Sequence, residues 1–440
     1  MKVKKVVVIG CGLAGVAAAE AARANDRELQ ITVIDESSNA PYSRCGLPYV
    51  ISGRVSPQDL RLKDRSFFES SSIRYISGRK VALIDRQKKR VILDNREGVE
   101  GEEYDKLIIA TGSSKQIPNI PGSNKRGLYT LFTLEDAEEV KKAAKNSKSA
   151  IVVGSGPVAI IVSEQLAGMK VKTILVSENR LLEGILDSNV SLLVTSILEE
   201  QDIDVIAGKQ VKNFVGFDRV QGIVLDGQVL TADIVLLTGY LQPSTQLARE
   251  CGLKLSKSGR IVIDKRASTS DEDIFAAGDC SEIYSSILQE EIPLQQASLA
   301  LRSGIVAGTN AAGGSITLSE VVSNISFRLD GVDVCSVGIT EEEAEQRGIR
   351  AKSYESTEYQ FASYYPGGKQ LYSRLVVKEG GILIGAQLVG PSAAAWGNLL
   401  SMMISHSLPL SYLADLETSF SPLTQPYWPS PVIAAKSFEM

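Results

Sequence analysis

With 440 residues, 44% of them hydrophobic and 22% charged, the chain can bury several cores, and its length predicts about three domains. Its 47 basic and 52 acidic residues give a net charge of −5, which excludes the basic surplus typical of nucleic-acid-binding proteins. No apolar run reaches the length of a membrane span, and a single histidine argues against a Ser-His-Asp hydrolase or a histidine-rich metal site.

The first predicted element is a buried parallel strand over residues 6–9, which runs directly into a glycine-rich loop. Gly10 permits the tight turn of this loop, and Gly12 lets the backbone approach a pyrophosphate. Gly15 allows close packing of the Ala-rich helix predicted over residues 16–24, whose first N–H groups would donate to phosphate oxygens. The pattern predicts a dinucleotide-binding unit.

Asp35 supports this interpretation, because it directly follows the next apolar strand, residues 31–34. It comes 25 residues after Gly10, where a carboxylate accepts hydrogen bonds from ribose hydroxyls. Taken alone, the loop is also compatible with a glycine turn in another kind of α/β protein. The spacing between Gly10 and Asp35 favours nucleotide binding.

Residues 41–49 read Pro-Tyr-Ser-Arg-Cys-Gly-Leu-Pro-Tyr and place Cys45 beside the predicted dinucleotide site. A thiolate close to a redox cofactor can pass electrons into sulfur chemistry, so the combination predicts a flavin enzyme. Arg44 puts a permanent cation next to the thiol and Gly46 could begin a helix, and both influences favour the thiolate. The alternative is that Cys45 only packs beside the flavin, since free cysteines are often buried and inert.

An internal repeat predicts a second dinucleotide-binding unit. An apolar strand over residues 150–153 runs into Gly154 and Gly156 and then into a further helical segment.

Two further apolar strands are predicted outside the two glycine loops. A short apolar strand over residues 104–110 ends at Thr111 and Gly112, where the chain could cross from one unit to the other. A later strand delivers Gly278 and Asp279 to its C-terminal end, where open α/β sheets bind ligands. Asp279 is positioned to bind a cofactor hydroxyl.

Together these pieces resemble the pyridine nucleotide-disulfide oxidoreductases, in particular the single-cysteine branch of coenzyme A-disulfide reductases, NADH oxidases, NADH peroxidases and NAD(P)H-dependent persulfide or polysulfide reductases. The resemblance spans nearly the whole chain and includes the Tyr-Tyr-Pro-Gly-Gly turn at 364–368. It implies an α/β fold with two Rossmann-like dinucleotide-binding domains, as in glutathione reductase, and an α+β C-terminal dimerisation domain. The implied domains are an FAD-binding domain at 1–112 and 245–315, an NAD(P)H-binding domain at 113–244 and a dimerisation domain at 316–440.

The resemblance also implies a homodimer that binds FAD and uses NADH or NADPH as co-substrate. In this family the cysteine at the position of Cys45 is the single redox cysteine and faces the isoalloxazine ring. No metal is expected. The implied cofactor contacts are Gly10, Gly12, Gly15, Asp35, Ser43, Arg44, Thr111, Gly112, Gly278, Asp279 and Ala297 for FAD, and Gly154, Gly156 and Glu178 for the coenzyme.

The other cysteines have a different interpretation. No second cysteine lies near Cys45 in the sequence, which favours a partner sulfur supplied by the substrate, although Cys11 or Cys280 could lie close in space. Cys251 and Cys335 stand singly, and packing is the better interpretation for all four. The absence of a Cys-x-x-Cys pair argues against zinc or iron–sulfur ligation.

Several positions depart from the family pattern where the nicotinamide should bind. Pro157 and Ile161 stand where related enzymes often have a tyrosine gate and a glutamate, which puts the way electrons enter in doubt. Coenzyme preference is open as well. Glu178 would favour NADH by binding the ribose, whereas Ser177 with nearby Arg180 could accommodate a 2′-phosphate.

The C-terminal tail departs too. In the coenzyme A-disulfide reductase group, a tail tyrosine approaches the cysteine of the other subunit, and Phe420 stands in its place here, without a phenol proton donor. Four aromatic residues of the C-terminal part could line a wall of the site, but aromatic side chains in a dimerisation domain are more often in the core or at the interface. Tail prolines predict an extended, poorly helical segment laid across a second subunit. The aromatic residues are Tyr364, Tyr365, Tyr427 and Trp428, and the tail prolines are Pro422, Pro426, Pro429 and Pro431.

The sequence therefore predicts an FAD-dependent, homodimeric NAD(P)H oxidoreductase whose Cys45 reduces a small disulfide, persulfide or polysulfide. One alternative is an NADH oxidase or peroxidase in which Cys45 cycles through sulfenic acid. A second is an electron-transfer subunit for a ferredoxin- or rubredoxin-like iron–sulfur partner, and the least favoured is a non-enzymatic flavin scaffold. No nucleic acid or membrane partner is expected. A cytoplasmic location is predicted, because the nucleotide loop already occupies the N-terminus.

Overall fold

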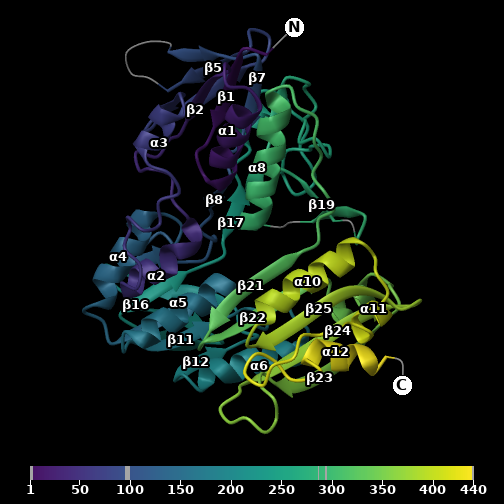
Figure 1. Cartoon of the computed structure of the whole chain (residues 1–440). Helices are drawn as coiled ribbons and strands as arrows, with labels where there is room; N and C mark the ends of the chain where they lie inside the picture. The colour runs from purple at the N-terminus through teal and green to yellow at the C-terminus, as the bar shows by residue number, and fades with distance from the viewer. Residues whose placement is uncertain (1–2, 95–99, 286, 293–294, 439–440) are drawn as a thin grey trace.

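The structure is a computed structural model that describes residues 3–94, 100–285, 287–292 and 295–438. Within this part of the chain, three five-stranded sheets and their helices form three regions. Figure 1 shows the first region at the top, the second at the lower left and the third at the lower right. This arrangement confirms the predicted α/β class with two dinucleotide-binding units and a C-terminal domain.

The first region is built around a parallel sheet. Its strands in spatial order are β18 (Ile274–Ala276), β7 (Lys106–Ile109), β1 (Lys5–Ile9), β2 (Gln30–Ile34) and β3 (Ile73–Ile76). The surrounding elements are α1 (Leu13–Asn25), α3 (Arg65–Ser70), β4 (Val81–Asp85), β5 (Arg90–Leu93), β6 (Gly101–Glu103), α7 (Gln246–Glu250) and α8 (Ala297–Ala311). Val6 and Val8 pack toward α1 and α8, whereas Val7 and Ile9 pack toward β4 and β5. Burial on both faces explains why β1 is continuously apolar.

The second region repeats this design, as the internal glycine loop predicted. Its sheet has the order β12 (Ile203–Ile206), β11 (Lys172–Val176), β10 (Ser149–Val153), β16 (Ile234–Leu237) and β9 (Leu128–Thr130), all parallel. Around it lie α4 (Leu134–Ala144), α5 (Pro157–Gly168), α6 (Ser188–Glu199), β13 (Val211–Val215), β14 (Gly222–Leu225) and β15 (Gln228–Thr231). Two crossing strands, β8 (Ser113–Lys115) and β17 (Leu241–Pro243), pair antiparallel and join it to the first region (Figure 1).

The third region is an antiparallel sheet with helices. Its strands in spatial order are β21 (Asn324–Leu329), β22 (Val332–Gly338), β25 (Ile382–Gly390), β24 (Gln370–Lys378) and β23 (Ala351–Tyr359). Its helices are α9 (Glu341–Gln346), α10 (Ala393–Ser405), α11 (Ser411–Ala414) and α12 (Ser430–Lys436), and a short hairpin of β19 (Ile283–Ser285) and β20 (Glu290–Ile292) precedes it. Antiparallel pairing accounts for the connections of a few residues between β21 and β22 and between β24 and β25.

The expectation of a poorly helical tail is wrong at its end. Residues 415–429 carry no helix, but Pro431 lies in the first turn of α12. Proline is tolerated there because the N–H groups of the first turn have no partner within the helix. None of the helices in the described ranges combines the length and the hydropathy that a membrane crossing requires.

Glycines set the distance between α1 and α8, which lie side by side in Figure 1. A Cβ atom at Gly308 would lie 2.1 Å from the carbonyl oxygen of Ala18, and one at Gly304 would lie 2.3 Å from that of Ala14. We expect Gly308→Ala to lower the free energy of unfolding by about 1–3 kcal/mol, because the added carbon forces the helices apart. The control, Gly168→Ala, adds a carbon in open space at the end of α5 and should not destabilise. Thermal unfolding would check both, and equal losses would contradict the packing argument.

Candidate functional site

The first glycine loop has the geometry of a phosphate cradle. Gly10 has a φ of +95°, and a Cβ atom there would lie 2.3 Å from the carbonyl oxygen of Ala110. Gly15 approaches the carbonyl oxygen of Gly10 so closely that a Cβ atom would lie 1.9 Å away. At Gly12, which precedes α1, a Cβ atom would meet nothing within 4 Å. The loop is therefore tight inside and open at the helix N-terminus, where a pyrophosphate would fit.

Asp35 lies beside this loop, directly after β2. One carboxylate oxygen accepts the backbone N–H of Cys11 at 2.5 Å, and the other accepts that of Ser37 at 2.7 Å. A carboxylate has about four acceptor positions, so two backbone bonds leave capacity for ribose hydroxyls. The structure thus brings Asp35 to the loop, as a ribose-binding role requires.

Asp279 comes from a distant part of the chain and directly follows Gly278, which packs close to Ala14 in α1. Its carboxylate accepts the Ser113 hydroxyl at 3.1 Å. Burial raises the pKa of Asp279, and the Ser113 hydrogen bond and the nearby charges of Arg44 and Arg260 oppose that rise. Arg44 and Asp279 are therefore close enough to interact, although 234 residues separate them in the sequence.

The other predicted cofactor contacts surround these residues. Thr111 donates its hydroxyl to the Ser244 carbonyl at 2.6 Å, and the Gly112 carbonyl accepts the Ser244 N–H at 2.9 Å, where the two crossing strands meet. A Cβ atom at Gly278 would lie 2.9 Å from Cβ of Ala14 in α1. The remaining two positions are Ser43, whose N–H donates to the Leu60 carbonyl, and Ala297, the exposed first residue of α8.

Cys45 lies in the short 3₁₀ turn η1 (Arg44–Gly46), directly before α2 (Leu47–Ser52). Its side chain is exposed, as is that of Arg44, whose guanidinium lies 4.0 Å from the centre of the Phe132 ring. The helix expected to begin near Gly46 is present, with six residues. The thiol is therefore accessible at the edge of the predicted flavin site.

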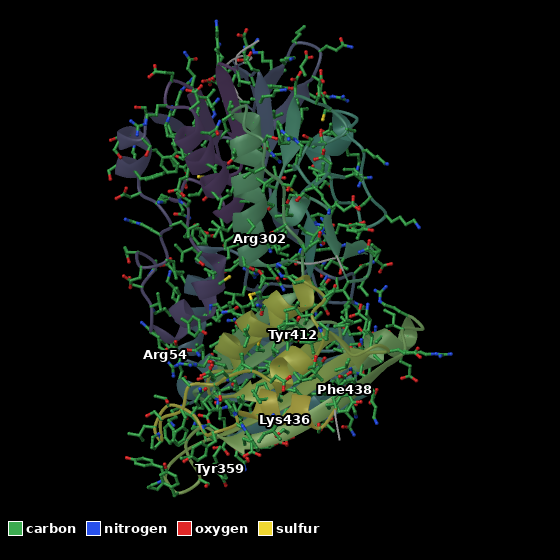
Figure 2. All side chains as sticks on the ribbon, turned by 45° about the vertical axis from the view of Figure 1, so that its right-hand side comes forward. Arg54, Arg302, Tyr359, Tyr412, Lys436 and Phe438 are labelled. Carbon is green, nitrogen blue, oxygen red and sulfur yellow. The ribbon has the colours of Figure 1, made fainter. Side chains whose placement is uncertain are left out.

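Charged residues gather next to Cys45, around Tyr49. Burial raises the pKa of Tyr49, and the Glu164 carboxylate adds to the rise. Arg54 and Arg328 oppose it, and Cys45 is close enough to act on Tyr49 as well. Figure 2 shows Arg54 at the outer edge of the molecule. Tyr49 thus lies within electrostatic range of one carboxylate and two guanidinium groups, and Arg328 among them is paired with the Asp333 carboxylate at 2.8 Å.

The other four cysteines have different surroundings, and none of the five forms a disulfide. Cys11, Cys280 and Cys335 are buried, and Cys251 is half-buried. Burial raises the pKa of each of these four thiols, that of Cys335 to about 12. They remain protonated at neutral pH, which supports the packing role predicted for them.

The second glycine loop resembles the first in shape. Gly154 has a φ of +155°, and a Cβ atom there would lie 2.2 Å from the Thr238 hydroxyl. At Gly156, directly before α5, a Cβ atom would meet nothing within 4 Å. Pro157 opens α5, and Ile161 is almost fully buried one turn later. The departures at these two positions therefore leave the loop geometry intact.

The segment after β11 contains Ser177 and Arg180, the two residues considered for binding a 2′-phosphate, and they lie in different surroundings. Ser177 is only 1% exposed, and its hydroxyl has no hydrogen-bond partner among the described residues. Arg180 forms an ion pair with Glu342 and donates to the Leu186 carbonyl at 3.0 Å. Glu178 is exposed. Glu178 is therefore exposed and Ser177 buried, whereas Arg180 is 28% exposed and is held by Glu342 and the Leu186 carbonyl.

Among the residues that sequence reasoning missed are four that contact or lie near predicted site residues. Ser113 directly follows Thr111 and Gly112, so its position next to the predicted crossing was the available signal. Phe132 and Arg260 lie in segments with no motif, and Glu342 lies in an ordinary acidic helix. Their roles depend on contacts between distant segments.

Comparisons with known proteins agree with this geometry. The family model described as pyridine nucleotide-disulphide oxidoreductase matches residues 4–304, and the model of its dimerisation domain matches residues 330–427. An NADH oxidase of Methanocaldococcus jannaschii is 28% identical over 95% of each chain. An NAD(P)H coenzyme A polysulfide/persulfide reductase of Pyrococcus horikoshii is 27% identical over 98% of each. The structure of an NAD-dependent persulfide reductase from A. fulgidus is 28% identical, with a TM-score of 0.95 over 99% of this chain and 83% of that one. The chain therefore belongs to the pyridine nucleotide-disulphide oxidoreductase family.

Proposed function

We propose that the chain is an FAD-dependent NAD(P)H oxidoreductase in which Cys45 reduces a small disulfide, persulfide or polysulfide. The observation that carries this proposal is the difference among the five thiols. Cys45 is exposed next to the dinucleotide site, whereas burial raises the pKa of each of the other four. The names of the reductases from P. horikoshii and A. fulgidus support the same substrate class.

The family uses FAD and NAD(P)H, and the residues of this chain fit both. When bound, FAD supplies two-electron transfer between nicotinamide and sulfur. Gly12 and the first turn of α1 would hold its pyrophosphate, and Asp35 would accept from its adenosine ribose. Gly156 and Glu178 would serve the nicotinamide coenzyme in the same way.

Cys45 would act as the nucleophile. Its thiolate attacks one sulfur of a disulfide R–S–S–R, the S–S bond breaks, and the leaving thiolate takes a proton from solvent. The resulting mixed disulfide on Cys45 is reduced by two electrons that come from NAD(P)H, which releases the second thiol and regenerates the Cys45 thiolate. Arg44, the exposed neighbour of Cys45 in η1, would favour anionic sulfur compounds at this position.

The C-terminal region would form a homodimer. Several of its aromatic side chains are half or more exposed, which is typical of surfaces that another chain covers. Figure 2 shows two of them, Tyr359 and Tyr412, on this region. The set comprises Tyr359, Tyr364, Tyr412, Tyr427 and Trp428. The domain boundaries at 112, 244 and 315, and the cytoplasmic location, stay predictions.

An anaerobic titration of the purified protein with NADH and then NADPH tests the proposal. We expect loss of the oxidised flavin spectrum and growth of a long-wavelength thiolate-to-flavin charge-transfer band. Coenzyme A disulfide, glutathione persulfide or inorganic polysulfide added next should restore the oxidised spectrum without oxygen. Recovery only after oxygen or peroxide is admitted would contradict sulfur reduction.

A second candidate is an NADH oxidase, which the name of the M. jannaschii relative favours. In that case oxygen would take two electrons from NADH to give peroxide, and the Cys45 thiolate would attack one peroxide oxygen. The O–O bond would break, the leaving hydroxide would take a proton to become water, and Cys45 would become a sulfenic acid that two electrons from a second NADH return to the thiolate. The two functions differ in their need for oxygen. An oxygen electrode that records uptake of about one oxygen molecule for every two NADH consumed, with no response to added persulfide, would identify the oxidase.

A further inference from the structure

The segment after β11 carries Glu178 and Arg180, which bear on the choice between NADH and NADPH. A helix of the C-terminal region binds Arg180. Arg180 forms an ion pair with Glu342, which lies in α9, 162 residues further along the chain. The same guanidinium donates to the Leu186 carbonyl at 3.0 Å and lies 3.9 Å from the Glu183 carboxylate. Its Nε is buried and has no acceptor among the described residues. The Arg180 charge is therefore held in the junction between the second and third regions.

Glu342 is itself fixed on two sides. One oxygen of its carboxylate accepts the Ser188 N–H at 2.8 Å, while the other binds Arg180. Its backbone N–H donates to the Asp187 carboxylate at 3.0 Å. Asp187 is buried and also accepts from Arg374 at 2.9 Å. These contacts fix the position of Glu342, so its carboxylate binds Arg180 from the C-terminal region.

The coenzyme side of the segment is left with a carboxylate. Glu178 is exposed and lies near Tyr240, whose pKa is raised first by burial and then by the Glu178 charge. Ser177 is buried, so its hydroxyl does not face a ribose. Lys209, whose N–H binds the Ser177 carbonyl, has its ammonium 3.0 Å from the Asp226 carboxylate. A ribose diol can donate to Glu178, whereas a 2′-phosphate would meet like charge.

We propose that Glu342 determines the coenzyme specificity of this protein by holding Arg180 away from the coenzyme, so that the protein selects NADH over NADPH. This inference rests on the proposed function, because it takes the end of β11 as the ribose site. Glu342 does not touch the coenzyme and acts through Arg180, as a positioning residue. The Glu342 carboxylate in the third region thus determines which coenzyme the second region binds.

Direct binding to the FAD-loaded full-length protein tests this, with ADP-ribose and its 2′-phosphate as probes that carry no reducing equivalents. We expect wild type to bind ADP-ribose at least about tenfold more tightly by calorimetry. In Glu342→Gln, affinity for the 2′-phosphate should rise about tenfold, because the released Arg180 can form charge-assisted hydrogen bonds with it. Glutamine still accepts from Ser188, which favours retention of the fold.

Glu341→Gln is the matched control, since Glu341 lies in the same turn of α9 but pairs with Arg374. It should leave the ratio of the two affinities unchanged. Adding Arg180→Gln to Glu342→Gln should remove the gain, and Arg180→Gln alone should leave the wild-type ratio unchanged, which covers the case that Glu342→Gln does not fold. A wild-type preference for the 2′-phosphate, no gain in Glu342→Gln, or a gain that persists without Arg180 would overturn the inference. Failure of wild type to bind either probe would instead overturn the proposed coenzyme site on which the inference rests.

Discussion

Replacement of Cys45 by serine is expected to slow NADH-dependent reduction of a disulfide or persulfide by roughly a thousandfold or more. Serine has nearly the same size, but its oxygen cannot form the mixed disulfide on which the proposed turnover depends. Because Cys45 is exposed and free, the substitution should leave the melting temperature within about 2 °C of wild type. Anaerobic assays with each sulfur substrate, together with the loss of the charge-transfer band, provide the measurement.

The matched control is Cys251→Ser. Cys251 is half-buried, and its thiol contacts the Ala248 carbonyl at 3.4 Å, far from the turn that carries Cys45. This variant should keep both the band and the rate. A Cys45→Ser protein that reduces persulfide at the wild-type rate would show that Cys45 only packs beside the cofactor. Attention would then move to oxygen or to an iron–sulfur protein as the electron acceptor.

The architecture around the cofactors could be predicted because its signals are local. The apolar run at 6–9 requires burial on both faces, and Gly10 and Gly15 stand where the structure allows no Cβ atom. The second glycine loop repeats the pattern of the first, so the same argument predicts both nucleotide-binding units. The exposure of Cys45 was not predictable in this way, because cysteine is more often buried than exposed.

Contacts between distant segments explain what the sequence did not reveal. Arg180 lies two residues after Glu178, and the sequence alone leaves open whether Arg180 binds a 2′-phosphate. The structure pairs it with Glu342, and no periodicity or spacing relates two residues 162 positions apart. Pro431 illustrates the opposite error. The proline-rich run predicts an extended segment, but proline at a helix start is favoured by its fixed φ.

Asp187→Ala is expected to have the largest effect on stability, with a loss of about 3 kcal/mol in the free energy of unfolding. Asp187 is 2% exposed and connects the second region to the third. It accepts from Arg374 at 2.9 Å and from the Gln387 amide at 2.6 Å, and its own N–H donates to that amide. Alanine would leave the Gln387 amide and the Arg374 Nε without an acceptor, although Arg374 would keep its pairs with Glu341 and Glu355. Urea unfolding followed by circular dichroism gives the measurement, with loss of cooperativity as a sign that the two regions separate.

The pH dependence of Asp187→Asn distinguishes charge from shape. Burial alone would raise the pKa of Asp187, but hydrogen bonds from the Glu342 N–H, Gln387 and Arg374 outweigh it and hold the pKa below its usual value. A lowered folded-state pKa contributes stability above the unfolded value of about 3.9, and this contribution is lost as pH falls through the folded value. Wild type should therefore exceed Asp187→Asn in stability at neutral pH and approach it below about pH 4. A difference between the two proteins that stays constant down to pH 3 would mean that asparagine changes packing, and that the Asp187 charge is not what joins the two regions.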